Sequence, residues 1–193
     1  MRHRKGVRSA LTLAVAALAT ACANSATGPQ SVDPATQSRW DMDLTVRYLH
    51  SSPDQTCNGV SLLGLVIPAE FQYRITATYG SVTKSTESKG YGTVTGESKL
   101  LSNNETWNFA NQTWTFDNMK AGDAVDLTLY VTVWDGVAKD GYMNNRSNTL
   151  SLDPSSLLPT GGTKTGRALG VGKSTCGLTL YYDVTVRQRQ VSG

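Results

Sequence analysis

The chain has 193 residues, of which 39% are hydrophobic, and its 18 basic and 15 acidic residues give a formal net charge of +3. Four basic residues and no acidic residue precede position 22, so the rest of the chain carries 14 basic against 15 acidic residues, a net charge of −1. This balance provides no clustered positive field, and a nucleic-acid partner is therefore not expected. The length suits one domain of ordinary size with its own hydrophobic core.

The first 21 residues have the three parts of a secretory signal peptide. Basic residues occupy the start, residues 11–18 form a short apolar core, and small residues follow at positions 19–21. A helix needs about 20 apolar residues to cross a bilayer, and this run is much shorter. We expect residues 1–21 to be removed during export. An uncleaved N-terminal anchor is the alternative.

A cysteine follows these small residues directly. The run Leu18-Ala19-Thr20-Ala21-Cys22 resembles the lipobox of bacterial lipoproteins, although Ala19 stands where that family usually has leucine. The resemblance implies that Cys22 is lipidated and becomes the mature N-terminus. The protein is then exported and lipid-anchored to a bacterial membrane, on its periplasmic or outer-surface side, and two or more acyl chains make such anchoring stable. Ordinary signal-peptidase cleavage, which leaves Cys22 free, is the alternative.

Residues 22–38 are rich in Ser, Ala, Thr, Pro and Gln and show no apolar period. Such a composition cannot bury a core, and it predicts a flexible linker behind the lipidated N-terminus. Residues 39–193 are the predicted folded domain.

Apolar and polar residues alternate with period two along much of that domain. The alternation predicts strands that bury one face and expose the other, with Tyr48 on the buried face of the first strand. Residues 60–67 are more uniformly apolar, which predicts a central strand buried on both faces. Residues 81–97 and 157–173 are polar and glycine-rich and are expected to be long loops with weak strand pieces. The clearest alternation covers residues 40–48, 71–79, 125–134 and 178–187.

Turn signals separate these segments, among them Tyr79-Gly80-Ser81 and Gly161-Gly162, and no part of the domain shows a sustained helical period. Roughly eight or nine short strands at this spacing predict an all-β domain. We expect an antiparallel two-sheet sandwich, either immunoglobulin-like or of the jelly-roll type. A closed barrel is the alternative.

Cysteine usage agrees with export. Beyond Cys22 only Cys57 and Cys176 remain, which predicts one disulfide in an oxidising compartment. Cys57 follows the first predicted strand and Cys176 precedes the last one, so the bridge would join the two termini of the domain if these strands are antiparallel neighbours. Closing so long a loop stabilises a fold by about 3–5 kcal/mol. A metal site would need more cysteine or histidine residues, and neither a metal nor a cofactor is expected.

No group of residues forms a recognisable catalytic set, and we expect no catalytic residues. His50 is the single histidine after residue 22 and adjoins two serines, but neither serine has the context of a catalytic nucleophile. The glycine-rich run at 170–175 lacks the first glycine of a P-loop and precedes a strand instead of a helix. Asp41 and Asp43 share the polar face of a strand, where solvated charge is the ordinary explanation.

The segment 105–119 repeats the pattern Trp-x-Phe on either side of Asn111-Gln112. If that dipeptide is a hairpin turn, the four rings lie on one face of a two-stranded ribbon. Aromatic rings dominate protein cores, so we expect Trp107 in the core and Trp114 partly exposed. The alternative is an exposed binding platform that stacks on a sugar or grips a protein. The rings are those of Trp107, Phe109, Trp114 and Phe116.

Together these features predict a non-enzymatic, lipid-anchored envelope protein that acts as an accessory or scaffolding subunit of a larger membrane-associated complex. Its expected partners are the membrane, through the N-terminal lipid, and a protein of that complex. The alternative is an extracytoplasmic ligand-binding module, above all for carbohydrate, with the four aromatic rings as its platform. A hydrolase is the third possibility.

Overall fold

The structure is a computed structural model, and it describes most of the predicted domain. The predicted signal peptide, Cys22 and nearly all of the linker lie outside the described residues. Strands dominate the described part of the chain, which contains a single four-residue helix. The described residues are 38–51, 61–62, 65–66, 69–93, 95–102, 104–134, 143–173 and 176–190.

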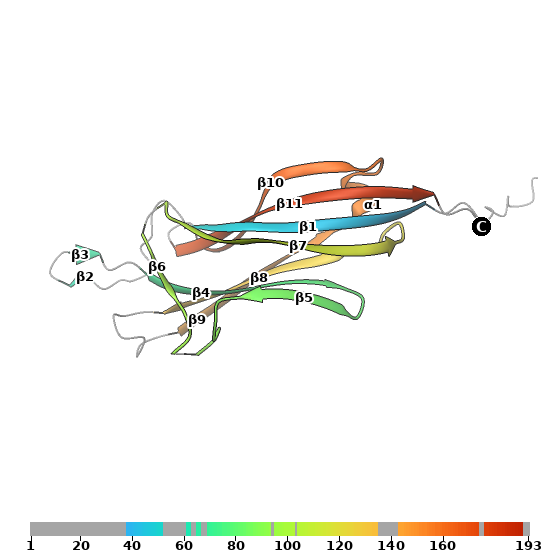
Figure 1. The fold of residues 1–193 in the computed structure, drawn as a ribbon. Coiled ribbons are helices and arrows are strands. Elements are labelled where there is room, and N and C mark those ends of the chain that lie inside the picture. The colour runs from blue at the N-terminus through green and yellow to red at the C-terminus, as the bar shows by residue number, and fades with distance from the viewer. Residues whose placement is uncertain are drawn as a thin grey trace, which may run out of the picture. The chain divides into compact units, whose positions relative to one another are not determined.

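The first sheet has four antiparallel strands in the order β10-β11-β1-β7 (Figure 1). Its centre consists of β1 (Ser38–Ser51) and β11 (Cys176–Gln190), the first and last strands of the domain. β7 (Thr106–Met119) and β10 (Gly162–Lys173) form its edges. The first and last strands are therefore antiparallel neighbours.

The second sheet has β4 (Ala69–Tyr79) and β8 (Val125–Trp134) at its centre. β9 (Met143–Leu152) pairs with the far side of β8. β5 (Val82–Glu87) and β6 (Lys99–Leu101) both pair with the other side of β4, along different parts of it. All of these pairings are antiparallel, and the order along the main path is β5-β4-β8-β9.

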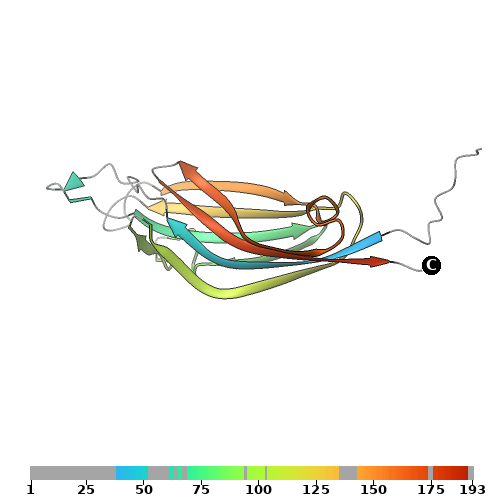
Figure 2. The same ribbon diagram turned by 90° about the horizontal axis from the view of Figure 1, so that it is seen from above.

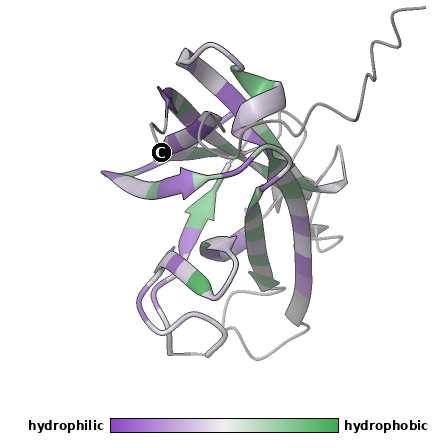
Figure 3. Cartoon of the chain, turned by 90° about the vertical axis from the view of Figure 1, so that its right-hand side faces the viewer, coloured by the Kyte–Doolittle hydropathy of each residue, from purple (hydrophilic) through white to green (hydrophobic). Residues whose placement is uncertain are grey.

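The two sheets pack face to face, as Figures 1 and 2 show. Alternate residues of the central strands fill the space between them, and Met42, Leu44, Ile75, Leu127 and Leu129 have no exposed surface. Burying each such side chain stabilises the fold by about 1.5–3 kcal/mol. Figure 3 shows apolar and polar segments following one another along the strands. The predicted antiparallel two-sheet sandwich is confirmed.

The predicted central strand over residues 60–67 is wrong. The structure has two short strands there, β2 (Ser61–Leu62) and β3 (Leu65–Val66), which pair with each other and with neither main sheet. Gly64 lies between them in the sequence, and glycine weakens the interior of a strand. The described part of this apolar run therefore forms a separate two-stranded pair.

Two of the predicted loops contain edge strands. Residues 162–173 of the segment 157–173 form β10, and residues 82–87 of the segment 81–97 form β5. An edge strand with one solvated face does not need apolar alternation, and polar or glycine-rich edges are common. The turns at Gly80 and Gly161-Gly162 were predicted correctly, and these glycines have positive φ angles.

A short helix, α1 (Pro154–Leu157), follows the second sheet. The side chain of Asp153 caps it by accepting a hydrogen bond from the backbone N of Ser155 at 2.8 Å. Just beyond the helix, the carbonyl of Pro159 accepts a hydrogen bond from Nε1 of Trp40 at 3.2 Å. The helix is thus connected to β1, and its leucine packs against the core.

Candidate functional site

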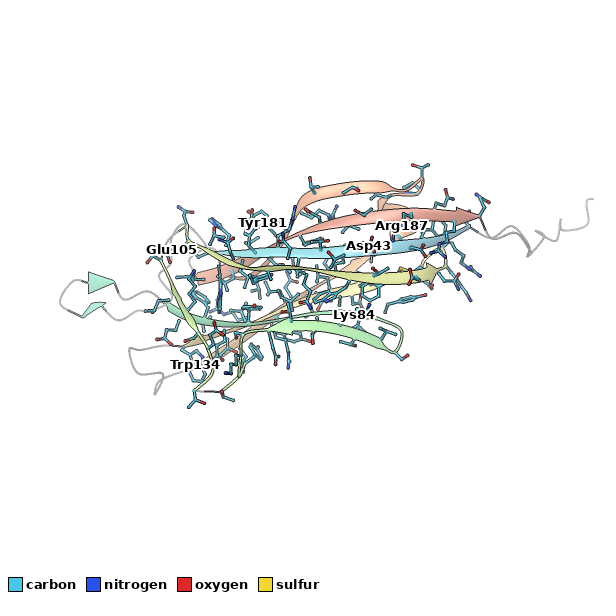
Figure 4. The ribbon with its side chains drawn as sticks, in the orientation of Figure 1. Asp43, Lys84, Glu105, Trp134, Tyr181 and Arg187 are labelled. Carbon is cyan, nitrogen blue, oxygen red and sulfur yellow. The ribbon has the colours of Figure 1, made fainter. Side chains whose placement is uncertain are left out.

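Two aromatic rings contact that of Tyr181 on the outer face of the first sheet, and we call Tyr48, His50 and Tyr181 the aromatic patch. The rings of Tyr48 and Tyr181 stack with their centroids 4.8 Å apart and an interplanar angle of 21°. The His50 ring meets Tyr181 edge-on at 6.3 Å, and its Nδ1 lies 3.2 Å from Oγ1 of Thr106. All three residues are half-buried, so each keeps part of its surface open to solvent. Figure 4 shows Tyr181 on the side of this sheet that faces away from the second.

A β-bulge in β1 places Tyr48 on this face. The pairing of β1 with β11 shifts between Val46 and Tyr48, where β1 has one residue more than its partner. The extra residue, Arg47, reverses the side of the sheet to which the following side chains point. The prediction that Tyr48 lies on the buried face is therefore wrong, and Leu49 occupies the core position with no exposed surface.

Three ion pairs connect β1 to β11 on the same outer face. Each joins an arginine to an aspartate on the neighbouring strand, and Figure 4 shows one of them, between Asp43 and Arg187. Each of these six charges would therefore still have its counter-charge if a bound partner covered this face. The pairs are Arg47–Asp183 with 2.8 Å between Nε and Oδ2, Arg187–Asp43 with 2.6 Å between Nη1 and Oδ2, and Arg189–Asp41.

Asp41 and Asp43, the two aspartates of β1, form hydrogen bonds with β7 in addition to their ion pairs. Asp41 is only 1% exposed, and its Oδ1 accepts a hydrogen bond from the backbone N of Asn118 at 3.0 Å. Asp43 accepts a hydrogen bond from Oγ1 of Thr115 at 2.7 Å. The hydrogen bond from Arg187 is the main cause that holds the pKa of Asp43 below its ordinary value of 3.8; burial opposes this shift, and the Thr115 hydroxyl supports it.

We expect the contribution of Asp43 to stability to disappear in acid. Its pKa is lower in the folded state than in the unfolded chain, so the contribution is present above the unfolded value and declines as the pH falls through the folded one. Thermal unfolding of the wild type and Asp43→Asn, followed from about pH 7 to about pH 2, measures the effect. The difference in Tm should narrow below about pH 4. An equally large difference at both ends of the range would contradict this assignment.

β7 is one continuous strand, so the predicted hairpin turn at Asn111-Gln112 is wrong. Its pairing with β1 shifts between Gln112 and Asn108, which leaves unpaired residues between them and creates a bulge. The bulge changes the phase of the side chains. Trp107 and Trp114, which would point to opposite faces of a regular strand, therefore both pack against the core.

The burial of the four predicted rings differs along the strand. Trp114 and Phe116 are 5% and 3% exposed and belong to the core, so neither offers a free face for a sugar. Trp107 and Phe109 are half-buried and contact Tyr73, with ring centroids 4.8 Å and 5.3 Å away. The expectation that Trp107 is the buried ring and Trp114 the partly exposed one is thus reversed.

The structure separates His50 from its neighbouring serine. Ser51 is fully buried, and its Oγ donates to the carbonyl of Ser102 at 2.6 Å and accepts from the backbone N of Glu105 at 2.8 Å. His50 lies on the opposite side of the sheet, in the aromatic patch. The two side chains are adjacent in sequence and cannot act together. The glycine-rich run at 170–175, which the sequence distinguishes from a P-loop, lies partly in a strand, because β10 continues to Lys173.

The remaining predicted site residues lie outside the described side chains. Cys22 and Cys57 are in undescribed segments, and of Cys176 only the backbone position at the start of β11 is described. Ser51 pairs with Leu178, so Cys176 lies at the end of the β1–β11 pair that is opposite to the termini of the domain. The Cys57–Cys176 disulfide stays a prediction, but the expectation that it would join the two termini of the domain is wrong, because Cys176 lies at the other end of the β1–β11 pair.

Within the described residues, no group of three or more His, Cys, Asp or Glu residues is arranged to hold a metal ion. No helix found there has the length and apolar character that would let it cross a membrane. The chain matches no protein-family model and no curated protein. Its function is therefore inferred from the geometry of the domain.

Proposed function

We propose that this protein is a non-enzymatic, lipid-anchored accessory subunit of a membrane-associated complex, and that its β-sandwich docks on a protein partner through the aromatic patch. The contact among Tyr48, His50 and Tyr181 on an open sheet face is the observation that carries the proposal. Tyrosine is enriched among the residues that contribute most to protein–protein binding, because it buries a large rigid surface and keeps a polar tip.

The surroundings of the patch support a docking role. The charges of the neighbouring ion pairs are already compensated, and Oγ1 of Thr45 is hydrogen-bonded to Oγ1 of Thr113 at 2.8 Å. Polar groups with partners of their own can be covered without a large desolvation cost. The patch therefore has the composition of an interface centre, with a polar rim that needs no new partner.

The position of the patch along β1 supports a protein partner in preference to the lipid surface. The linker meets the domain at Ser38, and Tyr48 lies ten residues further along the strand, a distance of about 30 Å. Cys176 precedes the patch residue Tyr181 in β11, so the proposed disulfide with Cys57 would stabilise the end of the sheet that carries the patch. The docking surface is thus at the end of β1 that is remote from the anchor.

Site-specific photocrosslinking tests the docking surface. Asn108 is exposed and pairs with Tyr48 on the neighbouring strand, so a photoreactive residue there lies beside the patch without removing any of its rings. Thr149, exposed on the second sheet, is the matched control position. We expect a discrete crosslinked protein in cell membranes from position 108 and none from position 149. Tyr181→Ala should reduce the adduct and weaken copurification about tenfold or more, as expected for a central interface residue.

Unfolding of the domain would also reduce the adduct, so the Tm of Tyr181→Ala is measured in parallel. Thr179→Ala, two residues away on the same face of β11, serves as the control for a change beside the rings. A folded Tyr181→Ala variant that crosslinks like the wild type would contradict the proposed surface. Equal adducts from positions 108 and 149 would contradict it as well.

A further inference from the structure

Arg74 lies on the outer face of the second sheet, where its guanidinium contacts two tyrosine rings. Its Cζ is 4.7 Å from the ring centroid of Tyr130 and 5.0 Å from that of Tyr91. Arg74 of β4 and Tyr130 of β8 are direct cross-strand partners, so the strand register fixes one side of this arrangement. Two cation–π contacts to the same guanidinium restrict its orientation.

The other ring is positioned by the segment that connects β5 to β6. The fully buried amide of Gln72 binds this segment twice: its Nε2 donates to the carbonyl of Thr93, and its Oε1 accepts from the backbone N of Gly92, both at 2.9 Å. A Cβ at the buried Gly96 would overlap the carbonyl oxygen of Gly90, so the segment is closely packed. Tyr91 is therefore held over the sheet by contacts that do not involve Arg74.

The guanidinium of Arg74 has no hydrogen bond or ion pair with any residue that the structure describes, and its Nε is buried without a partner. Its cross-strand neighbour on β5 is Glu87, which is exposed and makes no ion pair with it. Two arginines on the first sheet differ, because Arg47 and Arg187 both pair with aspartates. A guanidinium is always charged and is costly to desolvate without a counter-charge.

We propose that Arg74, Tyr91 and Tyr130 form a binding site for the carboxylate group of a ligand. A carboxylate matches the planar fork of a guanidinium and accepts two parallel hydrogen bonds from it. Arg74 is the one cation in contact with these two rings among the described residues, and one positive charge balances one carboxylate. Nε is buried while the side chain is still partly exposed, so we place the carboxylate at the edge that bears Nη1 and Nη2. The tyrosine rings form the walls against which its carbon body packs.

This site is on a different sheet from the aromatic patch, so it can be tested independently of the proposed docking function. The full chain, isotope-labelled and purified in detergent micelles, is titrated with sodium glucuronate and with sodium acetate, and amide chemical shifts are followed by NMR. Sodium chloride at matched ionic strength is the reference. We expect saturable shifts at Tyr91, Gly92 and Tyr130 with both carboxylates and none with chloride.

Substitutions assign the shifts to the guanidinium. Arg74→Gln should weaken carboxylate binding at least about tenfold, and Arg74→Lys should weaken it several-fold because a lysine keeps the charge and loses the fork. Arg47→Gln removes the same charge from the other sheet and should leave binding unchanged. Tyr91→Ala, in the connecting segment, should weaken binding although Arg74 remains. This variant still tests the site if Arg74→Gln fails to fold.

Three results would overturn the proposal. Shifts that stay linear and equal to those with chloride would show that no site exists. Equal binding by folded Arg74→Gln and by the wild type would place the carboxylate elsewhere. Saturation by inorganic phosphate, without saturation by either carboxylate, would assign the site to another anion.

Discussion

Replacing Cys22 with alanine should release the protein from membranes completely. The lipobox-like run before Cys22 implies that this residue bears the acyl chains. Alanine has no thiol and therefore cannot carry them. Two or more chains bury enough methylene groups to make anchoring stable, whereas a chain without them has only its linker and a nearly neutral domain. Fractionation of membranes, combined with incorporation of a labelled fatty acid, measures both consequences. We expect full membrane association with label in the wild type, and neither in Cys22→Ala.

A change beside the cysteine is the matched control. Ser25→Ala alters the linker without touching the lipidated position and should keep both the label and the membrane association. Membrane retention of Cys22→Ala without any label, together with residues 1–21 still present by mass spectrometry, would indicate an uncleaved anchor. A wild type that is released from membranes and carries no label would indicate ordinary signal-peptide cleavage. Either result would contradict lipid anchoring.

Trp114→Ala should be the most destabilising single substitution among the four aromatic residues of β7. The indole is 5% exposed, and Trp114 pairs with the fully buried Leu44 of β1. Truncation of a buried tryptophan removes its contacts and leaves a cavity, which costs about 3–5 kcal/mol. A loss of this size is a large part of the free energy of unfolding of an ordinary domain. Denaturant unfolding of the purified variant measures it.

Two comparisons on the same strand make this result specific. Trp107 is half-buried and packs against Tyr73, so Trp107→Ala should cost clearly less than Trp114→Ala. Gln112 is exposed, and Gln112→Ala should change the free energy of unfolding by no more than about 0.5 kcal/mol. If Trp107→Ala were the more destabilising of the two tryptophan variants, the burial seen along β7 would be incorrect.

Local alternation was sufficient to predict the framework of the sandwich. The segments 40–48, 71–79, 125–134 and 178–187 lie within β1, β4, β8 and β11, the central strands of the two sheets. A central strand has one face in the core, and this constraint selects an apolar residue at every second position. The period is therefore visible in the sequence, and so are the glycines at turns that require a positive φ angle.

Edge strands and bulges could not be predicted in the same way. β10 and β5 have few buried positions, so no apolar period marks them, and their existence depends on β11 and β4 as partners. The bulges at Arg47 and near Asn111 shift the phase of all following side chains without any change in composition. This shift is why Tyr48 points outward and why Trp107 and Trp114 both pack against the core.

The candidate sites likewise depend partly on local alternation and partly on the pairing of distant strands. Alternation places Tyr181, Arg74 and Tyr130 on the polar faces of their strands, and a tyrosine at such a position is a signal by which these surface residues could have been found. The contacts themselves required the tertiary structure. Tyr181 meets Tyr48 and His50 because the first and last strands are neighbours, and Arg74 contacts two rings because of a strand register and a packed connecting segment. A period within one strand carries information about its own two faces, whereas register and strand order arise from pairing with distant segments of the chain.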